Sequence, residues 1–142
     1  MRRISVMVVL VICFLLALPL AGVGADQSSD AVEGTWILTS AELGGKKLPD
    51  QGLKGTKLVL KSGHYQLQID EGTYKIIPGT PAAMDIVGTN GPNKGKTFLA
   101  VYELKGDRLE ICYDLEGKTR PTEFKTTTGT KQFLASYERA KE

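Results

Sequence analysis

Histidine, cysteine and tryptophan are scarce in this chain of 142 residues, which holds one histidine, two cysteines and one tryptophan. A zinc site uses three or four protein ligands, and His64 with Cys112 falls short of that number. Cysteine catalysis needs a base next to the thiol, and no motif brings His64 and Cys112 together. We therefore expect no metal, no cofactor and no enzymatic activity.

Net charge is low as well. Removing Arg2 and Arg3 from the 18 basic residues leaves 16, which equals the number of acidic residues. Nucleic-acid-binding domains usually carry a concentrated basic face. The composition therefore argues against nucleic acid as a partner.

Only one long apolar run occurs, at residues 6–20, after Arg2 and Arg3. Small residues follow, and the sequence becomes polar from Asp26 onward. This order is typical of a secretory signal peptide, with cleavage after Ala25. A retained membrane anchor is the alternative, but a spanning helix needs about 20 apolar residues. We expect residues 1–25 to be removed and the protein to be periplasmic or extracellular, with no membrane span left.

The chain beyond Ala25 has 117 residues, enough for one domain with a modest core. Cys112 is its only cysteine, so no intramolecular disulfide can form. We interpret residues 26–33 as a disordered leader and residues 34–142 as one folded domain, expected to be a monomer.

Short extended runs separated by turns dominate that domain. Gly44-Gly45 lies between two such runs, and two glycines with positive φ suit a tight hairpin. Only residues 49–54 could form a helical turn. About eight to ten short strands are expected, the main ones at residues 35–40, 56–61, 64–70, 73–77, 83–87, 97–104, 108–113, 120–125 and 132–139. This spacing predicts an all-β fold, either a small antiparallel barrel or a sandwich.

Two features favour the barrel. A barrel has no free edges, which suits an exported domain without disulfides. Residues 98–102 are apolar on both alternating faces, which indicates burial on both sides of that strand. Most aromatic residues share a face with other apolar residues and are expected inside: Tyr65, Tyr74, Phe98, Tyr102, Tyr113, Phe133 and Tyr137.

The motif Gly34-Thr35-Trp36 at the start of the first strand resembles the calycin and lipocalin group. In that group a tryptophan closes one end of the barrel, and an arginine from the last strand packs over it. Arg139 occupies the matching place here. The resemblance implies a barrel closed by Gly34, Trp36 and Arg139.

A closer resemblance is to a lipocalin-like domain family of unknown function that is expanded in planctomycete bacteria. It extends over nearly all of residues 34–142 and implies a lipocalin-like barrel without implying an activity. The motifs that carry it occur in order: Gly34-Thr35-Trp36, Leu53-Lys54-Gly55, Glu71-Gly72-Thr73-Tyr74-Lys75, Asp85-Ile86, Gly91-Pro92-Asn93-Lys94-Gly95-Lys96-Thr97, Tyr102-Glu103-Leu104, Gly106-Asp107, Leu109, Ile111-Cys112, Arg120-Pro121 and Phe124.

The glycine-rich segment at residues 91–97 is not a phosphate-binding loop. Its spacing is one residue short of the Walker pattern, and an extended run follows where a helix is needed. A small anion site built from Lys94, Lys96 and loop amides is a minor alternative. Asn93, Lys94, Lys96 and Arg120 are the candidate loop contacts, although an ion pair with a structural role is the favoured interpretation of Arg120.

The remaining chemical groups receive structural interpretations. Cys112 is expected to be a small thiol packed between strands. The carboxylates are scattered singly and are expected to be solvated. Asp70-Glu71-Gly72 is interpreted as a turn.

The leading hypothesis is a non-catalytic, exported barrel that binds a small apolar or amphipathic ligand. Its expected interior contacts are Trp36, Tyr65, Tyr74, Phe98, Tyr102 and Tyr113. The alternative is a barrel filled by its own side chains, which acts as a structural or protein-interaction module of the envelope, including a calycin-type enzyme inhibitor. An eight-stranded barrel is narrow enough for either outcome.

Overall fold

The computed structural model describes residues 27–141, so the predicted signal peptide lies outside the described residues. This part of the chain contains nine strands and no helix. The strands are β1 (Gly34–Leu43), β2 (Lys46–Lys47), β3 (Lys57–Lys61), β4 (His64–Leu67), β5 (Asp70–Ile77), β6 (Ala82–Asn90), β7 (Thr97–Lys105), β8 (Arg108–Asp114) and β9 (Gln132–Arg139).

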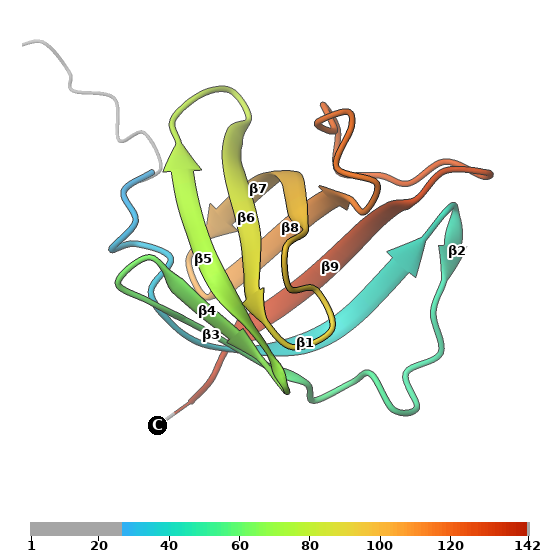
Figure 1. The fold of residues 1–142 in the computed structure, drawn as a ribbon. Helices are drawn as coiled ribbons and strands as arrows, with labels where there is room; N and C mark the ends of the chain where they lie inside the picture. The colour runs from blue at the N-terminus through green and yellow to red at the C-terminus, as the bar shows by residue number, and fades with distance from the viewer. Residues whose placement is uncertain (1–26, 142) are drawn as a thin grey trace, which may run out of the picture.

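The strands form one closed antiparallel barrel (Figure 1). β1 pairs with β3 along one edge and with β9 along the other, so eight strands close on themselves and β2 extends a hairpin from β1. The predicted all-β barrel is confirmed, and the pairing of β1 with β9 excludes an open sandwich. Gly44 and Gly45 have φ values of 55° and 82°, as the predicted hairpin requires.

Trp36 closes one end of this barrel, and we call it the closed end. Its side chain is fully buried, and its indole N–H donates to the carbonyl oxygen of Val32 at 2.9 Å. The guanidinium carbon of Arg139 lies 4.3 Å from the centre of the Trp36 ring. A Cβ on Gly34 would lie 2.8 Å from an Arg139 nitrogen, so glycine leaves room for the guanidinium. Gly34, Trp36 and Arg139 thus lie together, as the resemblance implied.

The start of the folded domain is earlier than predicted. Residues 26–33 were expected to be a disordered leader, but within this segment Val32 is fully buried under the barrel. Arg139 donates hydrogen bonds to the carbonyl oxygens of Ala31 and Glu33, and Gln27 exchanges two hydrogen bonds with Gly79. Figure 1 shows this segment on the same side of the barrel as the end of β9. Part of this attachment uses the backbone carbonyl oxygens of Ala31, Val32 and Glu33, which the sequence pattern does not display.

The long connection between β8 and β9, residues 115–131, covers part of the outer surface. Val101 and Cys112 point outward from β7 and β8 yet are 2% and 0% exposed. Arg120 donates to the Met84 and Ala100 carbonyl oxygens and pairs with Asp85. Residues 98–102 are therefore covered on both sides, as predicted. The predicted strand at residues 120–125 is wrong, because these residues cross the outside of the sheet without pairing to it.

Asp114 fixes the start of this connection. Its carboxylate accepts hydrogen bonds from the backbone N–H groups of Glu116, Lys118 and Thr119. Burial opposes the charge, but these N–H groups together hold the pKa of Asp114 below its ordinary value. The carboxylate therefore stabilises the turn when it is ionised.

We predict that Trp36→Ala lowers the free energy of unfolding by about 3–5 kcal/mol, because it removes a fully buried aromatic side chain and leaves a cavity. Urea unfolding followed by circular dichroism measures this loss. Ile69→Ala is the matched control, because Ile69 is 77% exposed and surface changes are usually within about 0.5 kcal/mol. A loss below about 1 kcal/mol for Trp36→Ala would contradict its role in closing the barrel.

Candidate ligand-binding cavity

The barrel interior contains a cavity of about 310 Å³. It reaches the surface at the end opposite Trp36, between the exposed residues Lys96 and Leu115. We call this opening the mouth; the β4–β5 turn, the β6–β7 loop and the start of the β8–β9 connection surround it. The wall consists of Leu58, Leu60, Tyr65, Leu67, Asp70, Tyr74, Met84, Ile86, Asn93, Lys96, Phe98, Ile111, Tyr113, Leu115, Phe133 and Tyr137.

Four of the six predicted interior contacts line this cavity: Tyr65, Tyr74, Phe98 and Tyr113. Trp36 and Tyr102 do not. Trp36 forms the closed end, and the Tyr102 hydroxyl approaches the Gln27 carbonyl oxygen at 3.5 Å, at the same end. Phe133 and Tyr137 were expected inside but were not named as contacts. Both line the cavity, and the centre of the Phe133 ring lies 6.0 Å from the centre of the Tyr113 ring.

The sequence interpretation of Asp70 is wrong. It was expected to be a solvated turn residue, but it is 6% exposed and lines the cavity at the mouth. The turn lies at Gln68 and Ile69 instead, and Asp70 begins β5 with its side chain on the inner face. Aspartate and glycine are both common turn residues, and their presence in Asp70-Glu71-Gly72 hid the alternation that places Asp70, Gly72 and Tyr74 on one face.

Asp70 holds together two segments at the mouth. One carboxylate oxygen accepts from the Asn93 side-chain amide at 2.7 Å and from the Tyr65 hydroxyl at 3.2 Å. The other accepts from the Asn93 backbone N–H at 3.3 Å. The carboxylate therefore links the β4–β5 hairpin to the β6–β7 loop, and the predicted loop contact Asn93 faces the cavity rather than solvent alone.

Gly72 allows the Tyr65 ring to take this position. A Cβ on Gly72 would lie 2.5 Å from a Tyr65 ring carbon and 2.0 Å from the carbonyl oxygen of Val87. No side chain can occupy that space, so the ring lies across β5 where only glycine is tolerated. The pairing between β5 and β6 is also shifted at Glu71 and Gly72.

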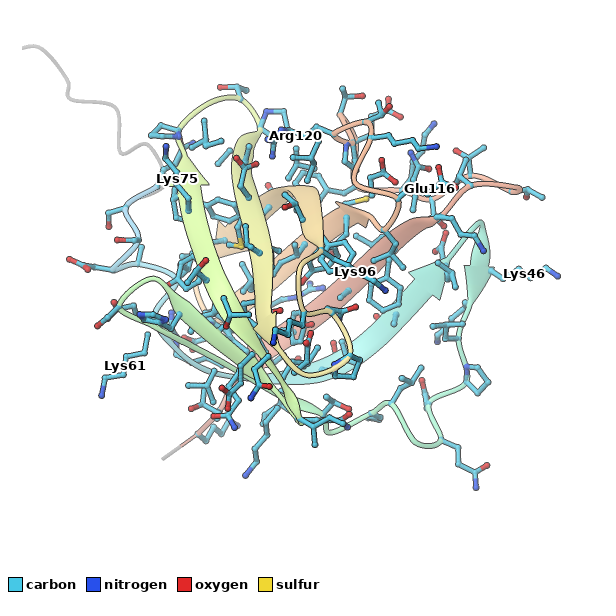
Figure 2. The ribbon with its side chains drawn as sticks, in the orientation of Figure 1. Lys46, Lys61, Lys75, Lys96, Glu116 and Arg120 are labelled. Atoms are coloured by element: carbon cyan, nitrogen blue, oxygen red, sulfur yellow. The ribbon has the colours of Figure 1, made fainter. Side chains whose placement is uncertain are left out.

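The β6–β7 loop does not form the anion site considered from the sequence. The backbone N–H groups of Gly91, Asn93, Lys94, Gly95 and Lys96 all donate to acceptors within the protein. Strand β7 follows at Thr97, so the helix that a phosphate-binding loop needs is replaced by a strand. Lys94 and Lys96 are exposed, and Lys96 is at the mouth. Figure 2 shows Lys96 well apart from Arg120.

Arg120 and Cys112 lie outside the cavity. Arg120 forms the predicted ion pair, with Asp85 on the outer surface of β6. The Cys112 thiol donates to the Lys125 carbonyl oxygen, and burial raises its pKa to about 11. His64 is on β4, four strands away from Cys112 around the barrel. The two side chains are therefore separate, and Cys112 packs under the β8–β9 connection.

The tyrosine hydroxyls in the cavity wall are kept neutral. Burial, then the charge of Asp70 and their hydrogen bond, raises the pKa of Tyr65 to about 12. Burial raises the pKa of Tyr137 to about 12, against a hydrogen bond from Tyr113. Burial also raises the pKa of Tyr113 well above its ordinary value. Part of this side chain faces the mouth, but its hydroxyl is buried.

Tyr74 lines the same cavity, and its hydroxyl is buried. Burial raises its pKa most, followed by the charge of Glu33, while the amide of Gly63 acts in the opposite direction. That amide is not placed for a hydrogen bond of regular geometry, and the hydroxyl has no other partner within residues 27–141.

Residues 27–141 contain no group of three or more His, Cys, Asp or Glu side chains placed to hold a metal ion. In the same range, no helix is long and apolar enough to cross a membrane. Comparison of the chain with protein-family models, curated proteins and solved structures found no match.

We predict that the protein becomes less stable as the pH rises from about 10 to about 12. Tyr65 and Tyr137 lose their protons at higher pH in the folded state than in the unfolded state, so ionisation favours unfolding. Their contribution is fully present below pH 10 and is lost as the pH passes the folded-state pKa values. Urea unfolding across this window, with tyrosinate absorbance recorded in parallel, measures the effect.

Tyr65→Phe and Tyr137→Phe should each flatten the decline, because each removes one of these ionisations. A free energy of unfolding that stays constant between about pH 9 and about pH 11.5 would contradict the burial of these hydroxyls.

Proposed function

We propose that this protein is a non-catalytic barrel that binds one small amphipathic molecule in its interior. The observation that carries the proposal is the cavity of about 310 Å³, which has apolar side chains on most of its wall and opens at the mouth. A dry apolar cavity of about 150 Å³ binds benzene. The cavity described here has about twice that volume, which suits a single aromatic ring with a short side chain.

The distribution of polar groups supports an amphipathic ligand over a purely apolar one. Aliphatic side chains from β3, β6 and β8 form one part of the wall, while Asp70, Asn93 and Lys96 gather at the mouth. Ligand pockets are typically apolar with a few polar groups that fix the orientation of the ligand. The apolar part of a ligand would enter first, and its polar group would remain near the mouth.

We also propose that the chain is a member of the lipocalin-like family named above and is exported to the periplasm or beyond. The closed eight-stranded barrel and the packing of Arg139 over Trp36 support the first part. The apolar run at residues 6–20, followed by small residues and a polar segment, supports the second.

A second candidate function is a protein-interaction module of the envelope. Ile69 favours it, because this side chain is 77% exposed at the tip of the β4–β5 turn. The backbone of Gly91 packs against the Ile69 carbonyl oxygen, so Ile69 and the β6–β7 loop present one continuous surface. A partner protein would contact this surface without entering the barrel.

Native mass spectrometry of the protein, purified gently from its own source, should reveal a bound small molecule that is lost on denaturation. Naphthol, an uncharged dye of two fused rings whose fluorescence changes in apolar surroundings, should bind to the emptied protein and be displaced by the released ligand. Leu67→Trp should abolish both signals, because Leu67 is partly buried in the cavity wall and a larger side chain blocks the space.

Val87→Trp is the matched control, because Val87 is 37% exposed on the outside of β6. It should bind the dye as the original protein does. A protein that carries no ligand and binds no dye would contradict the proposal and favour the interaction module.

A further inference from the structure

We infer that the cavity selects an organic cation, meaning a small amine with an apolar or aromatic body whose ammonium group binds Asp70. This inference rests on the proposed function and names the chemical class of its ligand. It depends on one feature of the mouth, which is a buried carboxylate whose partners are all neutral.

Asp70 is 6% exposed and lines the cavity. Its three hydrogen bonds come from the Tyr65 hydroxyl and from two N–H groups of Asn93, which are uncharged. No lysine or arginine within residues 27–141 forms an ion pair with it. Buried carboxylates are usually paired with a cation, because an isolated buried charge is costly. The missing cation is what a protonated amine would supply.

The carboxylate also has room to bind it. An ionised carboxylate offers about four acceptor sites, and three donors occupy Asp70 here. An ammonium N–H can use the remaining site from the cavity side. A charge-assisted hydrogen bond of this kind is roughly twice as strong as a neutral one, and it is strengthened by the low dielectric of the interior.

The aromatic side chains of the wall favour the same ligand. Tyr65, Phe98, Tyr113 and Phe133 all line the cavity, from four different strands. The face of an aromatic ring attracts a cation, whereas it offers nothing to a carboxylate. Burial raises the pKa of Tyr65, and the negative charge of Asp70 raises it further. The charge of Asp70 therefore acts on a side chain of the cavity wall.

Lys96 is the one cation among the described residues of the wall, and it is exposed at the mouth. It is not paired with Asp70. Its charge repels an incoming ammonium group and attracts an anion, so it opposes the selectivity that Asp70 provides. Asp70 has the larger effect on a ligand inside the cavity, because water and salt screen the charge of an exposed lysine much more than that of a buried carboxylate.

Three probes with the same aromatic body test the inference: phenylethylamine, phenylethanol and phenylpropanoate. They carry a positive, a neutral and a negative polar group. Displacement of naphthol from the purified protein near pH 7 gives their relative affinities. We expect the amine to bind at least about tenfold more tightly than the alcohol, and the acid to bind most weakly.

Three variants separate charge from structure. Asp70→Asn should remove the preference for the amine over the alcohol. Asn93→Ala weakens the link between the two segments but keeps the carboxylate, so it should retain the preference. Lys96→Gln should strengthen binding of the amine and weaken binding of the acid.

An amine that binds no more tightly than the alcohol overturns the inference and leaves the binding function intact. Persistence of the preference in Asp70→Asn also overturns it. If Asp70→Asn does not fold, the ranking of the three probes and the response of Lys96→Gln decide the matter. If neither the dye nor any probe binds, the binding function and the inference fall together.

Discussion

Pairing of β1 with both β3 and β9 is the constraint on which the rest of the structure depends. It removes every free edge among the eight strands, so no disulfide is needed to protect the sheet. It also fixes the circumference of the barrel. The interior then has a set volume, and the inward side chains leave about 310 Å³ of it empty.

The chain segments at the two ends of the barrel are held in place by different chemical groups. At the closed end, a cation lies on an aromatic ring and the backbone carbonyls of residues 31–33 accept the remaining hydrogen bonds. At the mouth, the polar link runs through the Asp70 side chain and leaves an opening beside Lys96. The cavity therefore opens at the end opposite Trp36.

Much of the fold follows from local rules that the sequence displays directly. Alternating apolar residues place Tyr65, Tyr74, Phe98 and Tyr113 inside, and paired glycines at Gly44 and Gly45 make the hairpin. Residues 120–125 show where such rules fail. Arg120 donates to carbonyl oxygens of β6 and β7, and the Lys125 carbonyl oxygen accepts from the Cys112 thiol, so side-chain contacts hold this segment on the outer surface without strand pairing.

The sequence by itself determined the all-β class and the aromatic interior, because the alternation of apolar residues is a property of neighbouring residues. The closure by Trp36 and Arg139 was implied only by the resemblance to the calycin and lipocalin group, because these two residues lie at opposite ends of the domain sequence. Only the tertiary structure decided whether the barrel is filled, that Asp70 is buried, and that Asn93 is its partner. The contact between Asp70 and Asn93 joins two residues that are 23 apart in the chain. The volume that remains between packed side chains depends on the whole circumference, and no single strand contains that information.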